Sequence, residues 1–165
     1  MRLIPLTALA LVVASQPGAA QGSCTPGDTA RTREELTIIY SGFRDGFIQN
    51  APQVWIDALD PSFTLTLFNG TIMPRDWVEG YVRSNATRFR IQTLAMVIRS
   101  LKPTADSVVA LIEQTSDREF NDEQGASHRL EVGALQIETW VCRAAGWRLA
   151  KVKEDSLLYL RRDGK

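Results

Sequence analysis

The segment 60–81 constrains the fold of this chain more than any other part of the sequence. An Asp-Pro pair ends a helical pattern, because the residue before a proline disfavours the helical conformation. Apolar residues then alternate with threonines, as in a strand with one buried face, and an Asn-Gly pair predicts a tight turn. A proline-started helix is expected next. The residues that carry this pattern are Asp60, Pro61, Phe63, Leu65, Leu67, Asn69, Gly70 and Pro74.

Helical patterns precede and follow that strand. Residues 30–49 carry an apolar stripe with spacings of three and four, which predicts an amphipathic helix. A second helix is expected over 50–60, with Asn50 as its cap. A third is expected from about Pro74 to Ser84. The stripe of the first helix consists of Leu36, Ile39, Tyr40, Phe43 and Phe47.

The rest of the sequence reads as four long strands, over 88–101, 107–120, 127–143 and 147–160. Polar turn residues separate them, and both strand faces are partly apolar. In 134–141 one set of alternating residues is apolar and the other is mixed, which favours a sheet packed on one face and lining a pocket on the other. The expected fold class is therefore α+β, with three N-terminal helices against an antiparallel sheet.

The composition limits the function classes that remain open. Apolar residues make up 44% of the 165, enough for one domain with a core, and 19 basic residues balance 19 acidic ones. A balanced chain has no electrostatic reason to bind nucleic acid or an anionic membrane. Two cysteines and one histidine are too few for a typical zinc site, and no glycine-rich phosphate loop is seen. We expect no cofactor and no metal.

The first 20 residues form a separate unit. A short basic start, an apolar run of about a dozen residues and a Pro-Gly-Ala-Ala end are typical of a cleavable signal peptide, with cleavage near Ala20-Gln21. The run is too short to span a bilayer core as a helix. We therefore expect a secreted or periplasmic protein that has no membrane segment after cleavage. Residues 21–29 form a flexible lead-in, 30–160 the domain and 161–165 a tail.

Cys24 and Cys142 are the only cysteines. In an oxidising compartment they can form one disulfide between the start of the mature chain and a late strand. Two unpaired thiols are an open alternative. A lipid anchor at Cys24 is a third, less favoured because Gln21-Gly22-Ser23 lacks the usual residue types.

At this point the chain resembles the nuclear transport factor 2-like superfamily, in particular its SnoaL-like branch, which includes the domain of unknown function 4440 type. Three motifs carry the resemblance, and together they cover about residues 30–160. They are A-L-D-P-S-F-T-L-T, F-N-G-T-I-M-P-R-D-W-V and E-T-W-V-C-R-A-A-G-W-R-L-A-K-V.

The resemblance implies a cone-shaped, strongly bent sheet, an α+β roll of the cystatin-like type, with helices folded against it and an internal pocket. Such domains commonly pair through the outer sheet face, so a homodimer is expected. The pocket would then be lined by Phe43, Phe47, Trp55, Phe63, Leu65, Trp77, Tyr81, Gln136 and Trp140.

Related enzymes include ketosteroid isomerase, in which a base carboxylate works with a tyrosine and a protonated aspartic acid. The element order places that tyrosine near Phe43, with Tyr40 one turn earlier, and the base near Leu67, where no carboxylate stands. Only the second acid has an equivalent, Glu138. If it faces the pocket, burial should raise its pKa. The candidate acid-base residues are thus Glu138, with Tyr40 or His128 as partner.

The function expected from these observations is the binding of a small apolar molecule in the pocket, without catalysis. A small lyase, isomerase or hydrolase that uses Glu138 is the first alternative. A domain whose role is dimerisation through the sheet is the second. For His128, close to a predicted hairpin tip, a solvated surface position is the simplest interpretation.

Overall fold

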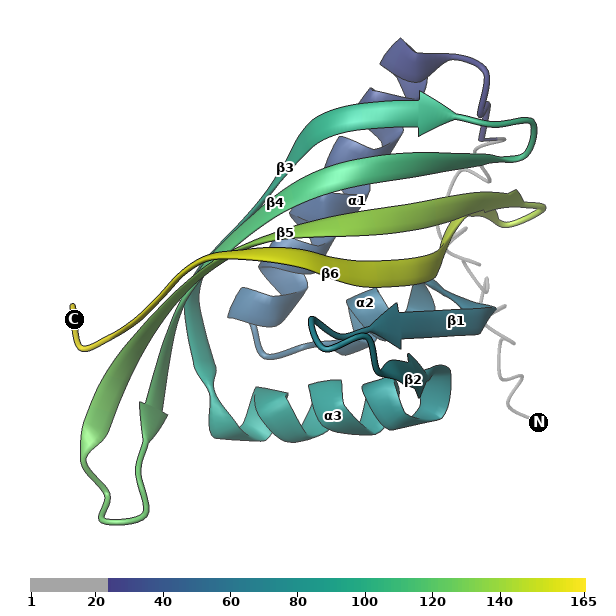
Figure 1. Ribbon diagram of the computed structural model, residues 1–165. Coiled ribbons are helices and arrows are strands. Elements are labelled where there is room, and N and C mark those ends of the chain that lie inside the picture. Colours follow the sequence, from purple (N-terminus) through teal and green to yellow (C-terminus); the bar gives the residue numbers. More distant parts are fainter. Residues whose placement is uncertain (1–23) are drawn as a thin grey trace, which may run out of the picture.

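The computed structural model describes residues 24–165, and the signal peptide expected over 1–20 lies outside this range. Within this range the chain forms three helices and six strands in the order α1, α2, β1, β2, α3, β3, β4, β5, β6 (Figure 1). Their bounds are α1 Thr29–Ile48, α2 Gln53–Asp57, β1 Leu59–Thr66, β2 Ile72–Pro74, α3 Arg75–Arg88, β3 Arg90–Pro103, β4 Ser107–Asn121, β5 Ser127–Arg143 and β6 Gly146–Arg162. The predicted α+β class is confirmed.

The six strands form one sheet in the order β2-β1-β6-β5-β4-β3. The four long strands follow one another as antiparallel neighbours, as the sequence predicts. The sheet is mixed, however, because β1 runs parallel to β6. Figure 1 shows the long strands bending strongly along their length, with the helices on one side of the sheet. The sheet does not close on itself, and β3 and β2 form its edges.

Local signals explain where the helices begin and how they pack. The side chain of Asp28 accepts a hydrogen bond from the backbone N–H of Arg31, which caps α1. Gly46 allows α2 close to α1, because a Cβ there would lie 3.0 Å from the carbonyl oxygen of Ala51 and 3.3 Å from the side chain of Val54. The α2 helix is shorter than expected at both ends. Its N-cap is Pro52, so the cap predicted at Asn50 is wrong, and β1 already begins at Leu59.

Asp60 has a different role from the helix end predicted for it. It lies in β1, and its carboxylate is almost fully buried, 2.8 Å from the guanidinium of Arg143 at the end of β5. The hydrogen bond from Arg143, with those from Ser62, lowers the pKa of Asp60 to about 2. This ion pair fixes the beginning of β1 against the end of β5.

The core lies between α1 and the inner face of the sheet. Aromatic rings from both layers meet there, with Phe43 of α1 stacked on Trp140 of β5 at a centroid distance of 6.2 Å. Two residues beyond Trp140 on β5, Cys142 forms a disulfide with Cys24, and the Cα atoms of the pair lie 5.7 Å apart. The core cluster comprises Leu36, Tyr40, Phe43, Leu59, Phe63, Val78, Val108, Ala110, Ile112, Trp140, Trp147, Leu149 and Val152.

Candidate functional site

A cavity of about 340 Å³ lies between the inner face of the sheet, the second half of α1 with the turn that follows it, α2, and α3. Its wall is mainly apolar, with a few polar side chains set into it, which is the usual composition of a small-molecule site. The lining residues are Phe47, Asn50, Pro52, Trp55, Leu65, Val78, Tyr81, Val82, Asn85, Ala86, Phe89, Ile91, Leu94, Met96, Gln114, Arg118, Val132, Gln136, Glu138, Val152 and Glu154.

Glu138 forms the most deeply buried polar part of this wall. Its residue is 1% exposed, and both of its oxygens accept hydrogen bonds. Oε2 accepts from the hydroxyl of Tyr40 at 2.6 Å and from Nε1 of Trp140 at 2.7 Å. Oε1 accepts from the amide of Gln136 at 2.8 Å. The carboxyl is thus held in one orientation by three donors.

The sequence I-E-T-W explains this arrangement. Successive side chains of a strand point to opposite faces, so Gln136, Glu138 and Trp140 share the inner face of β5. Tyr40 reaches the same carboxyl from α1, where it belongs to the apolar stripe. The indole N–H of Trp140 also lies 3.1 Å from the Tyr40 hydroxyl, which closes a three-membered network.

Burial decides the protonation state of this network. Desolvation raises the pKa of Glu138 from 4.5 to about 7, although the hydrogen bonds from Tyr40, Trp140 and Gln136 act in the opposite direction. Desolvation, together with the nearby Glu138, raises the pKa of Tyr40 well above its ordinary value. Near neutral pH the site therefore holds a carboxyl that can exist in either form beside a neutral phenol.

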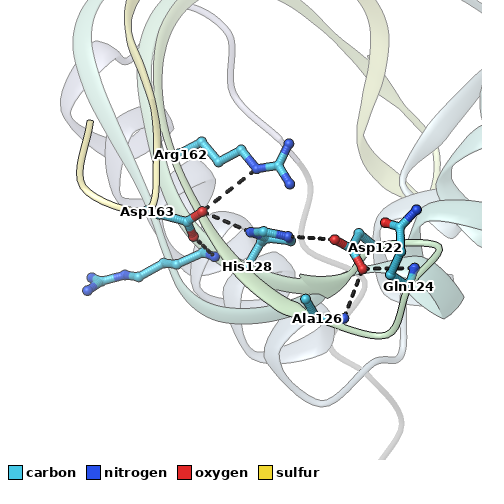
Figure 2. A network of polar contacts seen from close by, with 7 residues as sticks. Asp122, Gln124, Ala126, His128, Arg162 and Asp163 are labelled. Atoms are coloured by element: carbon cyan, nitrogen blue, oxygen red, sulfur yellow. Dashed lines mark hydrogen bonds and ion pairs between the residues drawn. The ribbon is translucent and has the colours of Figure 1, made fainter.

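His128 belongs to a second, distant polar cluster at the tip of the β4–β5 hairpin. Figure 2 shows its ring between two carboxylates, with Nδ1 2.8 Å from Asp163 and Nε2 3.0 Å from Asp122. Along β5 it lies ten residues from Glu138, roughly 30 Å of extended strand. It does not line the cavity. Its candidate role as a partner of Glu138 is therefore corrected, whereas Tyr40 does contact Glu138.

The other predicted pocket residues divide into two groups. Phe47, Trp55, Leu65, Tyr81 and Gln136 line the cavity. Four others do not, and their predicted place in the lining is corrected: Phe43, Phe63, Trp140 and Trp77.

Phe43, Phe63 and Trp140 are 0–2% exposed. They fill the core behind the cavity, where their rings pack between α1, β1 and the sheet. The prediction that Trp77 lines the cavity is wrong for a different reason. The turn of α3 directs Val78 inward and leaves Trp77 42% exposed, stacked on Tyr81 with ring centroids 5.1 Å apart.

Most of the lining residues that sequence reasoning missed come from α3, β3 and β4. Met96 and Leu94 line the cavity from β3, and Gln114 and Arg118 line it from β4. The signal that could have found Arg118 is the alternation of Ala110, Ile112, Gln114, Ser116 and Arg118 along one strand face, whose first two members are fully buried.

Residues 24–165 contain neither a metal-binding cluster nor a membrane-spanning helix. No group of three or more His, Cys, Asp or Glu side chains is placed to hold a metal ion in this part of the chain. No described helix has the length and apolar character needed to cross a membrane.

Comparison with solved structures places the fold. No protein-family model matches the chain, and no curated protein matches its sequence. An NTF2-like protein from Cytophaga hutchinsonii superposes with a TM-score of 0.57 at 10% identity, over 75% of this chain and 97% of that one. The fold is that of the nuclear transport factor 2-like proteins.

Two more structures of this fold show how varied its members are. Hexachlorocyclohexane dehydrochlorinase LinA-type3 from Novosphingobium barchaimii has a TM-score of 0.59 at 13% identity, covering 84% of this chain and 94% of that one. The Kfla4162 protein from Kribbella flavida has a TM-score of 0.63 at 16% identity, covering 81% and 95%. At these identities the likeness concerns the fold alone.

Proposed function

We propose that this chain is an exported member of the SnoaL-like branch. It binds a small, largely apolar molecule in the cavity whose wall contains Glu138. The observation that supports this most is the cavity of about 340 Å³, whose wall is mainly apolar. Burial of an apolar ligand there would be favoured by about 25 cal/mol for each Å² removed from water. The carboxyl of Glu138 supplies one oriented hydrogen-bonding group for the ligand.

Binding without turnover is the simplest role for this carboxyl. Three protein donors already engage its two oxygens. An acid-base reaction also needs a partner that exchanges the second proton, and His128, the residue best suited to that work near neutral pH, lies at the hairpin tip. The network is better suited to orienting a polar end of a ligand than to repeated proton transfer.

The test compares two adjacent residues of β3 that point to opposite faces of the sheet. Met96→Trp places an indole in the cavity, whereas Val97→Trp places it on the outer face, where Val97 is 45% exposed. A panel of neutral apolar compounds headed by 1-octanol should raise the melting temperature of the wild type and of Val97→Trp. Met96→Trp should lose this response. A wild type that responds to no compound would contradict the proposal.

One observation favours a catalytic alternative. A carboxyl with a pKa of about 7 in an apolar cavity is well matched to general acid-base work, and Tyr40 donates to it at 2.6 Å. The corresponding reaction class is proton exchange next to a carbonyl group. Cyclohexanone in D₂O would lose its α-protons faster with the wild type than with Glu138→Gln, as followed by proton NMR. Equal rates for both proteins would exclude this alternative.

We also propose that the chain forms a homodimer through the sheet. Large apolar side chains near the end of β6 are exposed at 46–58%, namely Leu157, Leu158 and Leu160. Exposed apolar strands invite association, so a partner surface would explain them. Sedimentation at micromolar concentration should give twice the monomer mass, and a monomer would contradict this proposal.

A further inference from the structure

The cavity wall contains one cation that no acidic side chain balances. Arg118 enters the wall from the inner face of β4, and the hydroxyl of Ser116, a neutral group, accepts a hydrogen bond from its Nε at 3.0 Å. Among residues 24–165 no carboxylate lies within ion-pair distance of its guanidinium. Arg31, Arg75, Arg99, Arg129 and Arg143 each contact a carboxylate within that distance.

The surroundings of Arg118 are unfavourable for an isolated charge. Leu94 of β3 and Val132 of β5 pair in register with Ser116, one inward position along β4 from Arg118, and both line the cavity. Ile91, also in the wall, pairs with Arg118 itself. Burial lowers the pKa of this arginine, yet a guanidinium remains protonated in proteins. A half-buried cation without a counter-charge costs free energy, and an anion that enters the cavity would recover it.

The other acidic groups of the wall do not supply that counter-charge. Glu138 is held by Tyr40, Trp140 and Gln136. Glu154 of β6 accepts a hydrogen bond from the backbone N–H of Phe68, at the end of β1. Arg118 therefore keeps N–H donors free to bind a group inside the cavity.

We propose that the ligand of this cavity is an apolar molecule with a single carboxylate, and that Arg118 binds this carboxylate. The planar guanidinium matches a carboxylate with two parallel hydrogen bonds, so it favours this group over a neutral amide of the same shape. The apolar body of the ligand then contacts Leu94, Met96 and Val132. This inference rests on the proposed binding function and specifies the chemical class of the ligand.

The experiment compares octanoate with octanamide, which has the same chain and a neutral head group. Binding is measured by calorimetry at pH 6, where an alkyl carboxylate is ionised. The wild type should bind octanoate about ten-fold or more tightly than octanamide, the difference typical of a charge-assisted hydrogen bond. Arg118→Gln should lose this preference and still bind octanamide.

Arg83→Gln is the matched control, because it removes one arginine charge from an exposed position on α3. It should keep the preference for octanoate. Equal affinity of the wild type for the two compounds would overturn the inference while leaving the binding proposal intact. A preference that survives in Arg118→Gln would overturn the role of Arg118. Binding of neither these compounds nor the neutral panel would overturn both proposals, and the wild-type comparison holds even if Arg118→Gln fails to fold.

Discussion

The buried carboxyl network around Glu138 and the hairpin-tip cluster around His128 both involve strand β5. They show two different ways of raising a pKa. The pKa of Glu138 is raised because burial disfavours its charged form. The pKa of His128 is raised because Asp122 and Asp163 favour its charged form. The first effect comes from the removal of water, and the second from hydrogen bonds to two carboxylates near the surface (Figure 2).

The difference matters because the two effects respond differently to the solvent. Salt screens charges near the surface, whereas it hardly reaches a group that is 1% exposed. Both groups bind a proton more tightly in the folded state, so both add stability at low pH. The pH dependence of stability therefore has two components in the same direction, and salt can separate them.

The largest effect is expected for Glu138→Gln. The wild-type pKa is raised from 4.5 to about 7, so its contribution to stability is complete below pH 4.5 and is lost as the pH rises through 7. The loss is about 3 kcal/mol in the free energy of unfolding, since each pKa unit corresponds to about 1.4 kcal/mol. Urea unfolding at pH 4.5 and pH 8 should show this decrease in the wild type. In Glu138→Gln the free energy of unfolding should decrease only slightly between the two pH values.

Glu34→Gln is the control for that measurement, because Glu34 lies exposed on α1. It should keep the full pH dependence. If Glu138→Gln kept it as well, the titration of Glu138 in this window would be excluded.

A smaller effect is expected for Tyr40→Phe. The substitution removes the donor to Glu138 Oε2 and the acceptor that lies 3.1 Å from Trp140 Nε1. Leaving buried groups without this partner costs about 1–3 kcal/mol. Because the bond from Tyr40 lowers the pKa of Glu138, its loss should also move the pH midpoint upwards. Tyr159→Phe, whose hydroxyl has no hydrogen bond to any described residue, should change neither quantity.

The smallest effect is expected for His128→Gln. The raised pKa of His128 means that its contribution to stability is present below pH 6.5 and is lost as the pH rises through the shifted value. The melting temperature at pH 6 should fall slightly in low salt, and this fall should disappear in about 1 M salt, where the screening length is about 3 Å. The effect of Glu138→Gln should persist in the same salt. A salt-insensitive effect of His128→Gln would remove the contrast between the two clusters.

The fold could be predicted from the sequence because its main signals are local. Alternation, turn residues and the helical stripe place the four long strands close to their observed bounds. The parallel pairing of β1 with β6 has no such signal, because it depends on which distant strand edges meet. The short strand β2 was also missed, since three residues are too few to show a period.

The site was only partly predictable. The alternation I-E-T-W was compatible with Glu138 on either face, and the structure places it inward. Trp77 and Val78 are both apolar neighbours on α3, so hydrophobicity alone could not decide which of the two faces the sheet. Phe43 and Trp140 face inward, but they pack against each other rather than bordering the space. Depth within a layer is a tertiary property that a one-dimensional pattern does not contain.

The disulfide between Cys24 and Cys142 makes most of the domain a covalent ring. A protease that cuts once anywhere between these residues would leave a single molecule on a non-reducing gel, and only reduction would release two fragments. The strand β6 lies after the ring, although it sits between β1 and β5 in the sheet. A cut in the turn before Gly146 would therefore free β6 from every covalent link, and only its hydrogen bonds and packing would then keep the sheet whole.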